Sequence, residues 1–457
     1  MNSKKLLPCG AAAIALALAT TFTATLAGCS NEELLALEES QTPASDAPSS
    51  TIRSIEEVLT IANVAAEMFD KPTVRSRSCQ TGVEPKVSVI KSHGSVSRSN
   101  ASDTLIYVVE YGNDNGFALI GAPQGSDEIL AVIDSGSYDS METLHNDGFQ
   151  FFLDAAKAKM MASSIGTIGP VTPGAQTWRS QIIDKIPTKL TVKWGKKYPE
   201  GLFCPNLVAG CVPTAMAQIL SYFEQPQSIS LTYPDHDKDL LQLDWGELKK
   251  HIQAFDSYDE DLIANHTLTC EASDEAHLDL ARLCRQLGHS INAKYRPEGS
   301  TGAFDANAIA QMRKLLPNNT ISTSKSFYSN TPSTLYDDIS EGIVYIRGDS
   351  KEGGHAWVAD GGRRVQNVIY QEVIGEIDPN TGHTLYEIIG DFTFYYYHFN
   401  WGFCGNANGY FQAGVFDTTK PSHFTKPNGW PEPDDYTRPG YGESHDFSEN
   451  VWYYSFK

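Results

Sequence analysis

An uncharged segment rich in glycine and proline divides this 457-residue sequence into two parts of different composition. The segment, residues 163–176 (SSIGTIGPVTPGAQ), has few helix-forming residues and is typical of an exposed linker that proteases can reach. A chain of this length also exceeds one average domain, which favours two folded units. We therefore expect a small unit before the linker and a larger one, residues 177–457, after it.

The sequence before the linker predicts a small α+β unit, residues 51–162. Apolar residues recur at helical spacing from Ser54 to Phe69, with Ser54 as the expected N-cap and Glu57 in the capping-box position. Short apolar runs at 105–110, 116–121 and 129–133 predict strands, and residues 149–161 predict a second helix. About 110 residues is an ordinary domain size.

The larger unit changes from helical to strand-rich along its length. After Gly342 come six apolar runs typical of strands: GIVYIRG, HAWVAD, NVIYQEVI, LYEIIG, FTFYYYHFN and GYFQAGV. A helical subdomain followed by an antiparallel sheet is an α+β arrangement.

Composition excludes several classes of function. The net charge of −21 argues against a nucleic-acid binder, which needs a basic face, and against attachment to anionic membranes by charge. Hydrophobic residues make up 41% of the chain, which is enough for a substantial core.

The first 29 residues predict a targeting segment. Lys4 and Lys5 precede an apolar run, Ala11–Ala19, that is too short to span a membrane comfortably. The following Leu26-Ala27-Gly28-Cys29 resembles the lipobox of bacterial lipoproteins, which implies lipidation of Cys29. Residues 30–50 then predict a flexible tether, so we expect an envelope lipoprotein at the outer membrane or cell surface, facing outward. The alternative is an ordinary cleavable signal in which Cys29 occurs by chance.

Cysteines outside the targeting segment predict neither a disulfide scaffold nor a metal site. They lack CxxC pairs and the His spacing of a zinc site. In an oxidising compartment Cys270 and Cys284 are able to pair, and the sequence leaves this open. The six are Cys79, Cys204, Cys211, Cys270, Cys284 and Cys404.

Cys211 is the strongest candidate nucleophile. Gly210 precedes it, and Pro213 suits the first turn of a helix whose apolar face continues through Val212, Met216 and Ile219. A cysteine at a helix N-terminus has a lowered pKa, because the helix dipole favours the thiolate. The alternative is an inert buried cysteine.

Two later motifs supply partners for such a thiolate. His355 starts an apolar strand after two glycines, Gly353-Gly354-His355-Ala356-Trp357, which leaves its ring approachable as a base. In His398-Phe399-Asn400-Trp401-Gly402, the Asn400 side chain is a candidate acceptor for the imidazole N–H, and Trp401 is a candidate shield for that bond. The alternative for both motifs is a purely structural role in strands.

Together these motifs resemble those of the streptopain family of papain-like cysteine peptidases, including members from Bacteroides and Prevotella. The family pattern has a GCVATA-type nucleophile helix, a GGHAxVxDG base strand and an HxNWGWGG loop. His355 follows Cys211 by 144 residues, within the roughly 130–150 typical of papain-like enzymes. Residues 51–162 likewise resemble the family's inhibitory prodomain. The resemblance implies a papain-like α+β fold preceded by a small α+β prodomain, and no cofactor or metal.

The resemblance also implies roles for individual residues. Cys211 is the nucleophile, His355 the proton acceptor, and Trp401 and Asn400 support the histidine. The family carries Gln as an oxyanion donor in a WGQ or YNQ segment, where this chain has Trp194-Gly195-Lys196. Lys196 thus occupies a possible oxyanion-hole position, and loss of one such donor costs about 10²–10³ in rate. Phe403 and Cys404 also replace the family's Trp and Gly.

The sequence therefore predicts a secreted or surface-anchored cysteine endopeptidase made as a zymogen. Its expected partners are protein or peptide substrates, its own prodomain as inhibitor, and a membrane through the lipid anchor. One alternative is a catalytically impaired binding or inhibitory lipoprotein, which the Lys196 substitution favours. Another is an amidase of cell-wall peptides, against which the prodomain argues.

Overall fold

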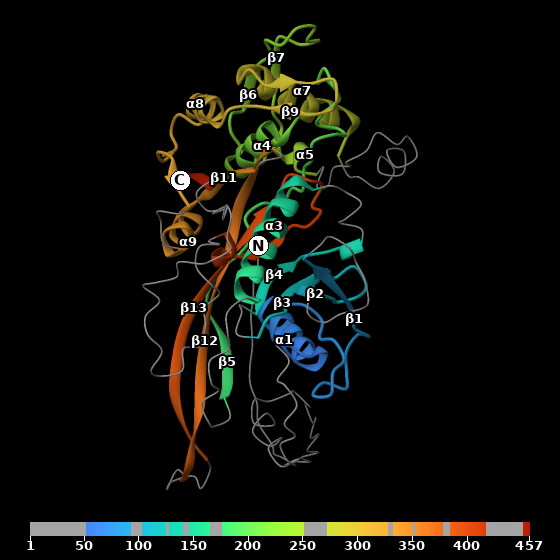
Figure 1. Cartoon of the computed structure of the whole chain (residues 1–457). Coiled ribbons are helices and arrows are strands. Elements are labelled where there is room, and N and C mark those ends of the chain that lie inside the picture. The colour runs from blue at the N-terminus through green and yellow to red at the C-terminus, as the bar shows by residue number, and fades with distance from the viewer. Residues whose placement is uncertain are drawn as a thin grey trace, which may run out of the picture. The chain divides into compact units, whose positions relative to one another are not determined.

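A computed structural model describes most of the chain from residue 52 onward (Figure 1). The described ranges are 52–92, 103–124, 128–139, 146–164, 176–250, 272–327, 332–350, 353–377, 384–416 and 451–457. The targeting segment with Cys29, the tether, Cys270 and residues 165–175 of the linker lie outside them.

The N-terminal part contains the helices and the three strands that the sequence predicts, and one further strand, β1, that it does not. Helix α1 (Ile55–Met68) begins with the expected capping box, in which the Ser54 hydroxyl accepts from the Glu57 N–H and the Glu57 carboxylate from the Ser54 N–H. Four antiparallel strands follow in a sheet, and then a long helix. These are β1 (Lys86–Lys91), β2 (Thr104–Glu110), β3 (Phe117–Gly121), β4 (Ile129–Ile133) and α3 (Asp147–Ser164).

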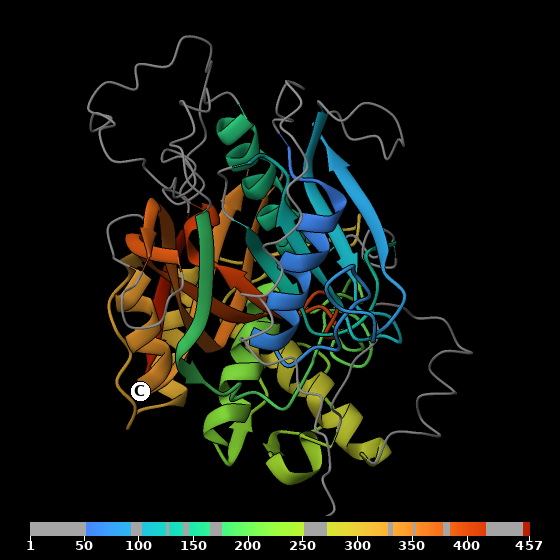
Figure 2. The ribbon, with the colours of Figure 1, turned by 90° about the horizontal axis from the view of Figure 1, so that it is seen from below.

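Strands β2, β3 and β4 are buried on both faces. Alternate residues such as Tyr107 and Ala118 join a hydrophobic cluster with α1, while Val108 and Leu119 join a second cluster with α3. Figure 2 shows α1, in blue, running along one face of these strands. Burial on both faces explains why the sequences of these strands are continuously apolar, without the alternation of apolar and polar residues that a half-exposed strand shows.

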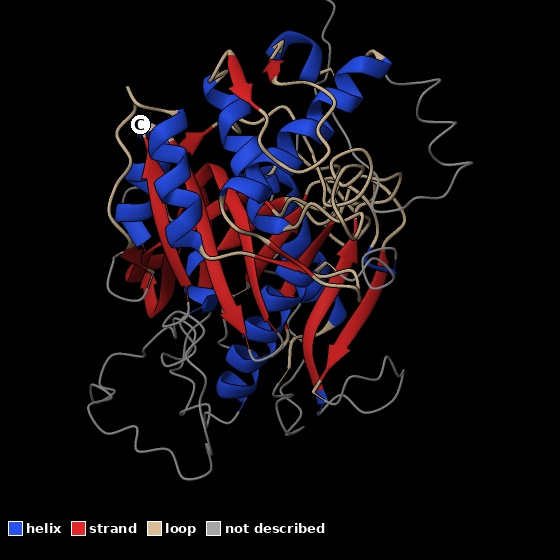
Figure 3. Ribbon diagram, turned by 90° about the horizontal axis from the view of Figure 1, so that it is seen from above, coloured by secondary structure: helices blue, strands red, loops and turns tan. Residues whose placement is uncertain are grey.

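The C-terminal part combines helices with long strands. Helix α4 (Cys211–Phe223) packs against α7 (Asp274–Ser290), α8 (Asp305–Leu315) and strands β11 and β12 around one hydrophobic cluster. In Figure 3 the strands, in red, lie among the blue helices. The remaining helices are α5 (Trp245–Leu248) and α9 (Pro332–Glu341), with a short 3-10 helix at Ala413–Phe416.

The strands of this part range from two-residue pairs to the long strands β12 and β13. They are β5 (Gln176–Ile186), β6 (Ser228–Ser230), β7 (Leu240–Gln242), β8 (Lys294–Tyr295), β9 (Thr301–Gly302), β10 (Lys325–Ser326), β11 (Ile343–Ser350), β12 (Gly353–Ile377), β13 (Thr384–Asn400), β14 (Gly409–Gln412) and β15 (Val451–Phe456).

Two strands are longer than the sequence pattern predicts. HAWVAD and NVIYQEVI were expected to be separate strands but are continuous in β12, and LYEIIG and FTFYYYHFN are continuous in β13 (Figure 1). The register of the pairing between β12 and β13 shifts between Ala359 and Gly361 and between Ile369 and Tyr370. Such bulges let a strand continue through glycines that look like a break in the sequence.

One antiparallel sheet joins the two parts of the chain. Within the described residues its order is β1-β2-β3-β4-β14-β13-β12-β11-β15-β10, and β5 also pairs with β12. The junction is the pairing of β4 with β14, where Gly409, Tyr410 and Phe411 face Ile133, Val132 and Ala131. Residues 50–457 accordingly cluster as one compact unit.

The structure confirms the α+β class, with a helical region and an antiparallel sheet. The boundaries proposed between prodomain, linker and peptidase domain stay predictions. None of the helices in the described ranges has the length and apolar character to cross a bilayer.

Candidate active site

Cys211 is the first residue of α4, as the sequence predicts. Gly210 before it has a φ of 94°, and a Cβ at this position would lie 2.9 Å from the Thr301 side chain. Glycine is therefore required there by both conformation and space. The Cys211 N–H is among the first N–H groups of the helix, which have no hydrogen-bond partner within it.

His355 lies near the start of β12 and is almost fully buried. Its Nε2 is 2.9 Å from the Trp401 carbonyl oxygen, while its buried Nδ1 has no hydrogen-bond partner among the described residues. A carbonyl only accepts, so Nε2 carries the proton. In the neutral ring Nδ1 is then left unprotonated and is the nitrogen able to act as a base.

The Cys211 thiol is acidic in this environment. Burial raises its pKa, but the neighbouring imidazole of His355 and the charge of Lys196 lower it more strongly, to about 7. Near neutral pH a large fraction of the side chain is therefore thiolate, the nucleophilic form.

Asn400 supports the site without contacting the imidazole. Its Nδ2 donates to the Val192 carbonyl at 2.9 Å, and its Oδ1 accepts from Gln218 Nε2 at 3.0 Å and from the Gly402 N–H at 3.2 Å. The acceptor expected from Asn400 is thus provided by the Trp401 carbonyl. Gln218, two turns after Cys211 in α4, was not predicted, although a polar residue on an apolar helix face was a visible signal.

Trp401 and Trp357 surround the imidazole with aromatic rings. The ring centroids of His355 lie 6.2 Å from Trp357 and 6.4 Å from Trp401, and both indoles are fully buried. The indole Nε1–H of Trp401 donates to the Ala407 carbonyl at 3.0 Å. These rings lie around the bond between His355 and the Trp401 carbonyl, whereas the bond that Trp401 was expected to shield, between Asn400 and the imidazole, is not formed.

Lys196 lies at the same site with its side chain only 14% exposed. Its Nζ is 2.9 Å from Asp147 Oδ2 and 4.6 Å from the centroid of the Phe403 ring. The loop that carries it is fixed by buried Glu200, whose carboxylate accepts from the Gly195 N–H at 3.0 Å. Burial raises the pKa of Glu200 well above its usual value. No local sequence pattern predicts this loop contact, because it depends on tertiary packing.

The start of α3 lies against His355. A Cβ built on Gly148 would lie 2.6 Å from the His355 ring and 2.4 Å from the Trp401 ring. Asn146 caps this helix by accepting from the N–H groups of Gly148 and Phe149, and its Nδ2 donates to the Asn406 carbonyl at 2.9 Å. The Asn146-Asp147-Gly148 turn, next to the predicted helix, was a cap signal that the sequence interpretation missed.

A charged cluster connects the N-terminal part to β13. His398 Nδ1 lies 2.5 Å from Asp360 Oδ1, and Nε2 lies 2.8 Å from Asp134 Oδ2. Burial lowers the pKa of His398, but the two carboxylates raise it well above the usual value. Asp134 follows β4, so this contact lies beside the junction of β4 with β14.

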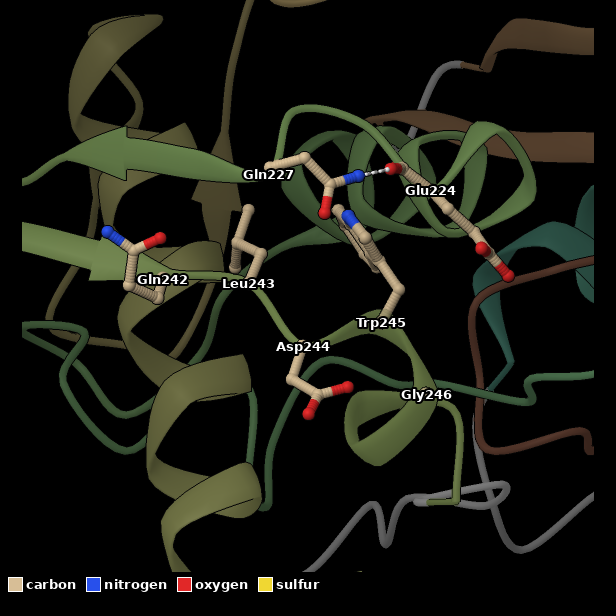
Figure 4. A pocket seen from close by; sticks show the side chains of 7 residues that line it. All are labelled: Glu224, Gln227, Gln242, Leu243, Asp244, Trp245 and Gly246. Atoms are coloured by element: carbon tan, nitrogen blue, oxygen red, sulfur yellow. Dashed lines mark hydrogen bonds between the residues drawn. The ribbon is translucent and has the colours of Figure 1, made fainter.

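Other features of the described residues do not join this site. Three or more His, Cys, Asp or Glu side chains do not gather there as a metal ion would require. Cys284 is buried and free. A pocket that includes Glu224, Asp244 and Trp245 lies at the opposite end of α4, about 20 Å of helix away from Cys211 (Figure 4).

Sequence comparisons identify families for both parts of the chain. Residues 191–411 match the Peptidase C10 family, and residues 60–160 match the family described as Spi protease inhibitor. The site described above lies within these two ranges, with Cys211, His355 and Trp401 in the first and Asp147 and Gly148 in the second.

Individual relatives are distant in sequence. Thiol protease/hemagglutinin PrtT of Porphyromonas gingivalis is 24% identical over 76% of this chain, which spans only 39% of PrtT. Streptopain of Streptococcus pyogenes is 20% identical, over 78% of this chain and 84% of streptopain.

Solved structures that match include a prointerpain A fragment from Prevotella intermedia, 18% identical, with a TM-score of 0.47 over 81% of this chain and 98% of the fragment. Active interpain A of the same organism matches 53% of this chain and 92% of its own, with 19% identity and a TM-score of 0.33.

The first of these matches contains the helix that begins at Cys211 and the strand with His355. It places residues 191–411 in the Peptidase C10 family of cysteine peptidases, with an inhibitor-type segment before them.

Proposed function

We propose that this protein is the precursor of a cysteine endopeptidase that hydrolyses protein substrates. The observation that carries the proposal is a thiol with a pKa of about 7 at a helix N-terminus, next to a histidine whose Nδ1 is available as a base. An inert buried cysteine has a raised pKa, as Cys204 does, at about 11.

The proposed reaction follows from these positions. The Cys211 thiolate attacks the peptide carbonyl, and the tetrahedral oxyanion accepts from the Cys211 N–H. The imidazolium of His355 gives its proton to the leaving amine, which departs and leaves a thioester. Water, deprotonated by His355, then attacks the thioester and releases the acid product and the thiol.

Residues 60–160 are proposed to keep the precursor inactive. The start of α3 lies against the two side chains that a leaving group would contact, His355 and Trp401. A substrate is therefore unable to enter until this turn moves.

The test compares Cys211→Ala, His355→Ala and the double variant in casein hydrolysis. Each single change should remove most activity, and the double variant should lose no more than the worse single one, because the two residues act as a unit. A Cys211→Ala protein that still hydrolyses casein would exclude Cys211 as nucleophile. Losses that add would assign the two residues to different sites.

The alternative of an impaired binding protein is supported by one observation, the presence of Lys196 where the family has Gln. A thiol-directed covalent inhibitor, offered to the protein before and after proteolytic trimming, separates the two. Labelling of Cys211 without any casein hydrolysis by the trimmed protein would favour the binding protein.

We also propose that the precursor is secreted and anchored through lipid on Cys29. The support is the sequence Leu26-Ala27-Gly28-Cys29 after a short apolar run. A lipidated cysteine carries several acyl chains, and more than one chain is needed for stable anchoring. Cys29→Ser should move the protein from the membrane to the soluble fraction; a wild-type protein found wholly in the medium contradicts the anchor.

A further inference from the structure

The turn that covers the active site places a carboxylate beside the Lys196 ammonium. Asp147 Oδ2 lies 2.9 Å from Lys196 Nζ, while the next residue, Gly148, lies directly against His355 and Trp401. A short stretch of the chain's own backbone thus occupies the position where a substrate must pass. Its acidic side chain meets a basic one that belongs to the peptidase part.

We propose that Lys196 determines specificity, by selecting substrates with an acidic side chain just beyond the scissile bond, on the leaving-group side. The proposal rests on the proposed peptidase function. In the precursor Asp147 takes the place of that substrate side chain.

The position of His355 assigns the side of the scissile bond. The histidine protonates the leaving amine, so the part of a substrate that departs must lie against His355. Gly148 lies there, and Asp147 is its neighbour in sequence. A substrate side chain within a residue or two of the leaving nitrogen is therefore the one that reaches Lys196.

The setting of Lys196 makes its charge selective. Its side chain is 14% exposed and lies over the Phe403 ring, so its ammonium is partly removed from water. Among the described residues, Asp147 is the carboxylate that Nζ contacts, and it belongs to the segment that leaves on activation. A partly desolvated ammonium that loses its carboxylate gains from meeting another.

The local charge favours the same class of substrate. Lys193, Lys196 and Lys197 lie within five residues of each other, although the whole chain has a net charge of −21. The segment of sequence that carries Lys196 is therefore basic within an acidic chain.

The experiment uses the full-length protein, allowed to process itself until its activity is constant. Quenched fluorescent peptides that differ only by Asp or Asn at one position, scanned across the scissile bond, give a ratio of kcat/KM for each position. We expect about a tenfold preference for Asp at one leaving-group position, decreasing as salt is raised. The ratio cancels any change in overall rate between variants.

Lys196→Gln should reduce this ratio to about one, and Lys196→Glu should reverse it and favour a Lys peptide. Lys197→Glu, the same change of charge one residue along, should keep the wild-type preference. A wild-type ratio near one, or a ratio unchanged in Lys196→Gln, overturns the proposal. So does an equal loss in Lys197→Glu, which would mean a diffuse charge effect.

Casein hydrolysis by the wild-type protein distinguishes a failure of the Lys196 specificity from a failure of the proposed peptidase function. If casein is cleaved and the Asp preference is missing, specificity through Lys196 is wrong and the peptidase function stands. If neither casein nor any peptide is cleaved, the proposed function itself fails.

Discussion

Cys211 and His355 lie among aromatic rings and backbone carbonyls, and the acceptor for the imidazole N–H is the carbonyl of Trp401. A carbonyl fixes the tautomer of the ring but carries no full negative charge. The acidity of the thiol therefore depends mainly on the imidazole and on Lys196, and this dependence can be measured.

Alkylation of Cys211 by iodoacetamide should follow a titration with a midpoint near pH 7. The pKa is lowered, so the thiolate fraction rises as the pH increases through about 7. His355→Ala should move the midpoint upward, because the group that lowers the pKa most is removed. Mass spectrometry of the labelled peptide gives the rate at each pH.

Cys204 is the internal control for this titration, since burial raises its pKa to about 11 and it should stay unlabelled near neutral pH. A wild-type midpoint near the usual 9.0 would contradict the proposed activation of Cys211.

At the scale of elements, β4 holds the N-terminal part against the peptidase part. Its end carries Asp134, whose N–H donates to the Asn408 carbonyl at 2.8 Å and whose carboxylate meets His398. Burial raises the pKa of Asp134, but the charge of His398 lowers it more strongly, so the pKa is below its usual value. The pair is therefore charged over a wide range of pH.

Asp134→Asn should lower the free energy of unfolding of the full chain by about 1–3 kcal/mol, because buried His398 loses one of its two carboxylate partners. The pKa of His398 is raised in the folded protein. Its contribution to the free energy of unfolding is therefore complete below about pH 6.5, the usual pKa, and is lost as the pH rises through the pKa of the folded state. The pKa of Asp134 is lowered, so its contribution is present above 3.8 and is lost as the pH falls through the folded value.

Denaturant unfolding across pH measures this difference between wild type and variant, which should be largest between about pH 4 and 6.5. Asp139→Asn is the matched control, since Asp139 pairs with Lys86 at an exposed position and should matter little. A difference that stays constant from pH 4 to 10 would show that the pair with His398 is not its source.

Local sequence signals predicted most of these elements, and non-local pairing explains what they missed. The capping box at Ser54, strands β2 to β4 and the helix start at Cys211 all follow from patterns within about fifteen residues. The pairing of β4 with β14 joins residues far apart in the chain, which no local period encodes. For the same reason the role of the Trp401 carbonyl, the burial of Glu200 and the pair of Asp147 with Lys196 were not predicted.

At the scale of the whole molecule, one sheet passes through both the inhibitor-type part and the peptidase part. A cut in residues 163–176 breaks the chain but leaves the pairing of β4 with β14 and the contact of Asp134 with His398 intact. Cleavage and release are therefore separate steps.

A nicked protein should thus remain one particle in size-exclusion chromatography, and its activity should rise further on dilution or after a second cut within residues 51–162. Activity measured over a range of enzyme concentrations tests this, because dissociation depends on concentration and cleavage of the linker does not. Full activity at the moment of the first cut, independent of concentration, would contradict tight retention. A full-length protein already as active as the cleaved one would remove the inhibitory role altogether.

Release of the inhibitor-type part would also change what the peptidase presents to its surroundings. With β4 gone, β14 becomes an outer strand whose N–H and C=O groups, at Gly409 to Phe411, have lost their partners. Such a strand is a template on which another extended chain adds by main-chain hydrogen bonds. The freed enzyme would therefore be adhesive along this side, toward unfolded substrate or a second copy of itself, and the departing segment acts until then as a protective cover for the strand.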